Sequence, residues 1–62
     1  MNIQSAIIKG TNILKSRSIQ TAQLDAEILM AKVLGANREY IILNNNKGLE
    51  DQNYENFKVK VV

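Results

Sequence analysis

The chain has no cysteine and no histidine, and this absence limits how its 62 residues can hold a fold. Disulfide bonds are excluded, and so are the thiolate and imidazole ligands of a structural zinc site. A chain of this length buries only about 60% of the surface that its unfolded form exposes. Hydrophobic residues make up 45% of it and charged residues 23%, as in ordinary globular domains. We therefore expect one small domain, residues 1–62, that is stabilised by apolar packing alone.

Apolar residues in the first half of the chain recur at the three- and four-residue spacing of one helix face. This spacing predicts a first helix over Asn2–Lys15 and a second that follows Thr21 and ends at Leu34. Thr21 is the expected N-cap of the second helix, and Gly35 its left-handed C-terminal stop. Gly10, inside the first helix, indicates either close packing against a neighbour or a weakened helix middle.

The second half of the chain is less regular. Asn37 can cap a short third helix over Arg38–Leu43, although the apolar run Tyr40–Leu43 also fits a strand. The segment Asn44–Gly48, "NNNKG", is predicted to be a turn because Asn and Gly both tolerate positive φ. A fourth helix is expected to begin near Asp51, and the closing residues "KVKVV" are left open between a frayed end and an extended one. Since no second strand is found, we expect an all-α fold, a small bundle of four to five short helices.

The second helix carries apolar residues around much of its circumference, which predicts contacts with more than one neighbouring helix. One predicted stripe contains Leu24, Ile28 and Ala31, and an adjacent stripe contains Leu29 and Val33. The predicted core is Ile7, Leu14, Leu24, Ile28, Leu29, Val33, Tyr40, Leu43 and Phe57.

The polar residues form no recognisable catalytic arrangement. Asp25 and Glu27 are two residues apart on a helix, so they point to different sides, and we interpret both as charges that compensate the positive end of the helix dipole. No histidine is present to activate a serine, and the three glycines are too far apart for a phosphate-binding loop. We therefore predict no catalytic, cofactor-binding or metal-binding residue in this chain, and the sequence does not indicate which residues bind a partner.

The formal net charge of +2 is a weak electrostatic signal for nucleic-acid binding. The break after Leu34 superficially fits a helix-turn-helix, but Tyr40–Leu43 offers hydrocarbon where a recognition helix needs polar side chains, and Glu39 would repel phosphate. Lys32 and Arg38 are interpreted as parts of a solvated face. No apolar run approaches the roughly 18 residues that a membrane span needs. We expect a cytoplasmic protein without membrane contact and keep nucleic-acid binding only as a minor alternative.

The order of these features resembles a known family. The stretch "LDAEILMAKVLGANREYIILN" and the following "LEDQNYENFK" resemble the N-terminal domain of the HemK/PrmC methyltransferases, over Ile3 to about Lys58. The resemblance implies a small helical domain that helps to dock peptide chain release factors, the proteins of translation termination that these enzymes methylate on glutamine. The densest matches are Leu24, Asp25, Ala26, Glu27, Leu29, Val33, Leu34, Arg38 and Leu43.

The family's catalytic features have no counterpart in this chain. Its Asn-Pro-Pro-Tyr signature cannot occur in a chain without proline, and its glycine-rich S-adenosylmethionine loop is missing. We therefore expect a non-catalytic substrate-docking module, from either a longer gene product or a stand-alone relative, with S-adenosylmethionine bound only by the missing catalytic domain. The expected partner is a release factor. The alternatives are a small helix-turn-helix-like nucleic-acid-binding protein and a homodimer that covers the wide apolar face of the second helix.

Overall fold

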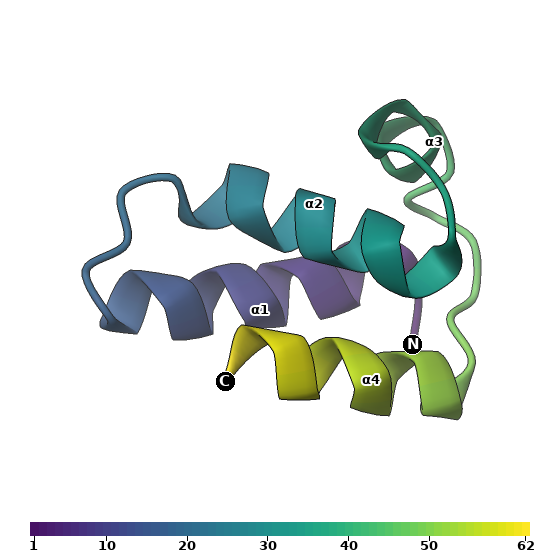
Figure 1. The fold of residues 1–62 in the computed structure, drawn as a ribbon. Coiled ribbons are helices and arrows are strands. Elements are labelled where there is room, and N and C mark those ends of the chain that lie inside the picture. Colours follow the sequence, from purple (N-terminus) through teal and green to yellow (C-terminus); the bar gives the residue numbers. More distant parts are fainter.

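The computed structural model describes residues 1–62 and consists of four helices joined by short connections. The helices are α1 (Ile3–Ser16), α2 (Ala22–Leu34), α3 (Arg38–Leu43) and α4 (Asp51–Val61). Figure 1 shows α1, α2 and α4 lying side by side, with the short α3 at one end of α2. The only β-type pairing is an isolated bridge between Asn2 and Gly48. The predicted all-α fold is confirmed, and the strand alternative for Tyr40–Leu43 is wrong.

Two asparagines begin helices by accepting a backbone N–H group that has no partner inside its own helix. The N–H of Ser5 donates to Asn2 Oδ1 at 2.7 Å, at the start of α1. The N–H of Tyr40 donates to Asn37 Oδ1 at 2.9 Å, at the start of α3. The predicted cap at Asn37 is therefore confirmed, and the first helix starts one residue later than expected because Asn2 is its cap.

The ends of α2 follow the sequence signals only in part. Gly35 adopts the left-handed conformation, with φ 65°, and terminates the helix as predicted. Thr21 precedes the helix but makes no capping hydrogen bond, because its hydroxyl donates to Asp25 Oδ2 at 3.1 Å instead. Ser18, in the connection from α1, has a φ of 64°, a conformation that non-glycine residues adopt at a cost.

The turn Asn44–Gly48 supplies hydrogen-bond acceptors to the start of α1. The N–H groups of Ile3 and Gln4 donate to the carbonyl oxygens of Lys47 at 2.9 Å and Asn45 at 2.8 Å. These N–H groups have no acceptor within α1, so the carbonyl groups of the turn accept their hydrogen bonds in place of water or a capping side chain. The predicted turn is confirmed, and it forms without a positive φ at any of its residues.

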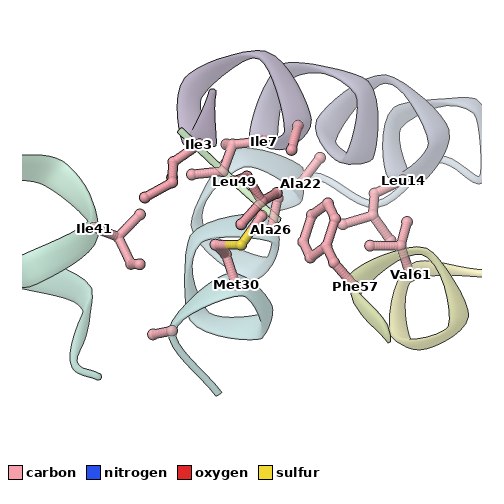
Figure 2. Packing of buried hydrophobic residues seen from close by; sticks show 12 residues of the cluster. Ile3, Ile7, Leu14, Ala22, Ala26, Met30, Ile41, Leu49, Phe57 and Val61 are labelled. Carbon is pink, nitrogen blue, oxygen red and sulfur yellow. The ribbon is translucent and has the colours of Figure 1, made fainter. Parts of the chain in front are cut away.

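The core is a cluster of 12 buried apolar residues contributed by all four helices and by Leu49 (Figure 2). Its members are Ile3, Ala6, Ile7, Leu14, Ala22, Ala26, Met30, Ala31, Ile41, Leu49, Phe57 and Val61. Ile7, Leu14 and Phe57 were predicted correctly, and Leu29 and Val33 pack against the cluster while remaining partly exposed. The helix continues to Val61, which is buried, so the closing residues neither fray nor extend.

Four predicted core residues are exposed, and the prediction for them was wrong: Leu24, Ile28, Tyr40 and Leu43. Leu24 and Ile28 are each 39% exposed, because α2 turns its alanines inward instead. Ala22 and Ala26 lie four residues apart on the buried face, where their small side chains allow neighbouring helices to approach closely. As predicted, α2 packs against more than one helix, namely α1, α3 and α4.

Gly10 is the point of closest approach between α1 and α4. A Cβ atom at this position would lie 2.5 Å from Cζ and 2.8 Å from Cε2 of Phe57. The aromatic ring therefore occupies the space that any other residue would fill. Of the two interpretations of Gly10, close packing is confirmed.

Candidate partner-binding site

An open groove of about 410 Å³ lies between α1, α2 and α3, and we call it the α1–α2–α3 groove. Its volume lies in the range of roughly 300–1,000 Å³ that is usual for ligand sites. The lining residues of α1 follow one another at three- and four-residue spacing, so they share one helix face. The lining consists of Gln4, Ile7, Ile8, Thr11, Asn12, Lys15, Gln23, Glu27, Ile41, Ile42 and Asn45.

Four isoleucines form the apolar part of the groove, two from α1 and two from α3. Ile7 and Ile41 are buried members of the core. Their sequence neighbours Ile8 and Ile42 are 52% and 46% exposed at the groove mouth. The core thus continues outward into an uncovered aliphatic surface, which is the kind of surface that marks an interaction site.

Carboxamide side chains from three segments surround these isoleucines: Gln4 and Asn12 from α1, Gln23 from α2 and Asn45 from the turn. None of their side chains makes a hydrogen bond within the chain. A carboxamide offers an acceptor oxygen and two donor hydrogens. The groove therefore presents donors and acceptors together, around an apolar centre.

Glu27 lies in the wall of the groove and is only 8% exposed. Its Oε1 accepts a hydrogen bond from Nε of Arg38 at 2.8 Å, and the Arg38 side chain is half-exposed. A hydrogen bond between ionised groups is roughly twice as strong as one between neutral groups. The pair fastens the start of α3 to the middle of α2 and so fixes the width of the groove. The prediction that Glu27 is a helix-start charge was wrong, whereas Arg38 is exposed as predicted and in addition pairs with Glu27.

Thr11 also lines the groove and is 8% exposed. Its hydroxyl oxygen is inaccessible to water and has no hydrogen-bond partner within the chain. Such a group is unusual, because most buried polar side-chain atoms have at least one partner. The groove thus contains one polar group that the fold itself leaves unsatisfied.

The other polar residues considered in the sequence do not join this site. Asp25 lies in the first turn of α2, as predicted, where it accepts from the Thr21 hydroxyl. Asp25 and Glu27 thus have different partners, as expected from their spacing, and no three His, Cys, Asp or Glu side chains gather in one place. Lys32 is exposed, in agreement with its interpretation as part of a solvated face.

A second hollow, of about 490 Å³, lies between the end of α2, α3 and the segment before α4. Its most prominent polar group is engaged, because the Lys47 ammonium lies 5.6 Å from the centre of the Tyr40 ring, within cation–π range. It contains neither a buried ion pair nor an unsatisfied buried hydroxyl. The α1–α2–α3 groove is therefore the stronger candidate.

The sequence patterns did not identify this groove, because its lining comes from segments that only the tertiary fold brings together. The nearest signal was the apolar run Tyr40–Leu43, but the predicted core took Tyr40 and Leu43 from it and left out Ile41 and Ile42. None of the four helices combines the length and apolarity that crossing a lipid bilayer requires.

Comparison with known proteins gives one consistent family. A family model described as the PrmC N-terminal domain matches residues 5–61. The release factor glutamine methyltransferase of Clostridium botulinum is 32% identical over 57 residues, which cover 92% of this chain and 20% of that protein. The chain thus spans about one fifth of the length of this relative. No solved structure shows significant similarity to the chain.

Proposed function

Since the chain belongs to the family of PrmC N-terminal domains, we propose that it is a docking module that holds a peptide chain release factor for glutamine methylation. The observation that carries the proposal is the family match over residues 5–61. The name of the Clostridium botulinum relative supplies the substrate class. Because release factors act on ribosomes, the module works in the cytoplasm.

The docking role is supported by what the surface offers. Exposed Ile8 and Ile42 beside unpaired carboxamides suit contact with another polypeptide, because a protein interface combines apolar anchors with peripheral hydrogen bonds. The chemistry belongs to the catalytic domain of the family's full-length members, which binds S-adenosylmethionine. In this chain the buried carboxylate of Glu27 is engaged by Arg38, so it is not free to act as a general base.

Calorimetric titration of the chain into a class I release factor tests the proposal. We expect saturable but weak binding, because in a full-length relative most of the interface would belong to the catalytic domain. A Kd of roughly 1 mM corresponds to a binding free energy of only about −4 kcal/mol. Absence of any interaction at that concentration would refute docking by this module. Methyl transfer to the release factor by the chain alone should be undetectable, and any turnover would contradict a purely docking role.

Self-association is a second candidate, favoured by the number of large apolar side chains on the surface. Leu24 and Ile28 lie four residues apart on α2, and Leu43 is 79% exposed at the end of α3. A symmetric dimer would cover such side chains at low cost. Sedimentation equilibrium at micromolar concentration distinguishes the two, since a dimer doubles the apparent mass of 7.0 kDa.

A further inference from the structure

We propose that the α1–α2–α3 groove is the part of the module that holds its partner, and that it holds an extended polypeptide segment with an aliphatic anchor. The inference rests on the proposed function, in that the segment belongs to a release factor. It adds the surface and the recognition chemistry, which family membership alone does not supply.

The anchor is inferred from the four isoleucines of the groove. Ile7 and Ile41 are packed into the core and cannot move aside, whereas Ile8 and Ile42 stand half-exposed at its mouth. An aliphatic side chain entering between them would contact hydrocarbon from both α1 and α3. Its burial would also remove the exposed area of Ile8 and Ile42 from water, which is the main source of favourable free energy.

The extended backbone is inferred from the carboxamides. Peptide groups present alternating N–H donors and C=O acceptors, and each carboxamide of the groove can satisfy either kind. Gln4, Asn12, Gln23 and Asn45 surround the isoleucines and have no partner of their own. A segment in a helix would have its peptide groups already paired and would leave these side chains unused.

The charges of the groove favour a neutral peptide over a nucleic acid. Lys15 is the only cation in the lining, and the one carboxylate there, of Glu27, is paired with Arg38. Nucleic-acid affinity comes mainly from several cations that neutralise phosphates, and one lysine does not supply them. The charge of Glu27 is balanced by that of Arg38. The groove therefore has little net charge that would disfavour an uncharged segment.

A second copy of this chain offers no suitable occupant. Its four helices hold 14, 13, 6 and 11 of the 62 residues, and of the large aliphatic residues in its connections Leu49 is in the core and Ile19 packs against it. The backbone of the longest connection, Asn44–Glu50, is bound to the start of α1. The partner must therefore supply the extended segment.

Two matched pairs of variants test the inference. Ile42→Glu places a carboxylate in the groove mouth, and Val59→Glu makes the same change on α4, outside the groove, at a position that is 77% exposed. Gln23→Ala removes one carboxamide of the groove, and Gln20→Ala removes an exposed one outside it. Circular dichroism melts first establish that each variant folds, and calorimetry then measures its affinity for the release factor.

We expect Ile42→Glu to weaken binding at least about tenfold, Gln23→Ala by roughly threefold, and both controls by less than about twofold. If Ile42→Glu fails to fold, the affinities of the milder variants Gln23→Ala and Gln20→Ala decide whether the groove binds the release factor. Equal affinities of groove variants and controls would overturn the groove while leaving the docking role intact. Absence of binding by the unaltered chain would refute the docking role and this inference together. Dimerisation that Ile42→Glu abolishes would show that a second copy occupies the groove, which also contradicts the inference.

Discussion

Replacing Gly10 with alanine tests the packing of α4 against α1. The added Cβ would lie 2.5 Å from Cζ of Phe57 and 3.4 Å from Cγ2 of Val61. Carbon atoms in good contact are about 3.5–4.0 Å apart, so the ring would have to move by about 1 Å. Phe57 is 1% exposed and is enclosed near Leu14 and Val61, as Figure 2 shows, so such a movement would disturb the core.

Two opposing terms decide the magnitude. Overfilling a packed core costs about 1–3 kcal/mol, whereas exchanging glycine for alanine inside a helix returns about 1 kcal/mol. Because the added Cβ would come within 2.5 Å of a buried ring, we expect the cost near the upper end of its range, and Gly10→Ala should lower the free energy of unfolding by about 1–2 kcal/mol. For a domain of this size, this corresponds to a fall in Tm of roughly 4–15 °C.

A double-mutant cycle followed by urea denaturation separates the two terms. In a Phe57→Leu background the ring is gone, so Gly10→Ala should raise the free energy of unfolding by up to about 1 kcal/mol. Gly48→Ala is the matched control, because a Cβ added there would meet no surrounding group within 4 Å. Its free energy of unfolding should stay within about 0.5 kcal/mol of the wild-type value. A Gly10→Ala protein as stable as the wild type, with Phe57 intact, would refute this account of the helix contact.

Three further substitutions probe other parts of the fold by the same denaturation assay. Arg38→Met leaves the buried Glu27 carboxylate without its partner and should lower the free energy of unfolding by about 1–2 kcal/mol. Adding Glu27→Gln should recover part of this stability, and no recovery would mean that the lost ion pair is not the cause of the destabilisation. Ile41→Ala should lower the free energy of unfolding by about 2–4 kcal/mol, because the Ile41 side chain is fully buried. Leu43→Ala, at an exposed position, should change it by less than about 0.5 kcal/mol, and equal losses would contradict the orientation of α3. Gly35→Ala should cost about 1 kcal/mol, because its φ of 65° strains a residue with a side chain, and an unchanged midpoint would argue against that conformation.

The helix positions could be predicted because their signals are local. The left-handed stop at Gly35 and the cap at Asn37 each depend on a few neighbouring residues. The role of the turn Asn44–Gly48 could not be predicted in the same way. Its carbonyl groups bind the start of α1, some forty residues earlier in the sequence, and only the tertiary fold brings them there.

The face that α2 buries could not be predicted from periodicity. Apolar residues occur around much of this helix, and the stripe that is buried contains Ala22, Ala26 and Met30. Ala22 and Ala26 fit the narrow space between close helices, and the larger Leu24 and Ile28 remain outside. A criterion that places the largest apolar residues in the core fails where helices approach closely.

The candidate site depends even more on long-range contacts. Glu27 and Arg38 are 11 residues apart and on different helices, and at the sequence level both resemble ordinary surface charges. The carboxamides of the groove are also unremarkable by themselves, in a chain with many Asn and Gln residues. Family resemblance suggested the docking role, but only the groove that α1, α2 and α3 line together indicates a surface for it.

Mapping the contact surface on the isotope-labelled chain by NMR tests the central claim most directly. The backbone amide signals of a ¹⁵N-labelled chain are recorded while unlabelled class I release factor is added. We predict saturable shifts concentrated at groove residues such as Ile8, Gln23 and Ile42, with small changes along α4 at Val59. Shifts centred on α4, or an unchanged spectrum at saturating release factor, would contradict the account.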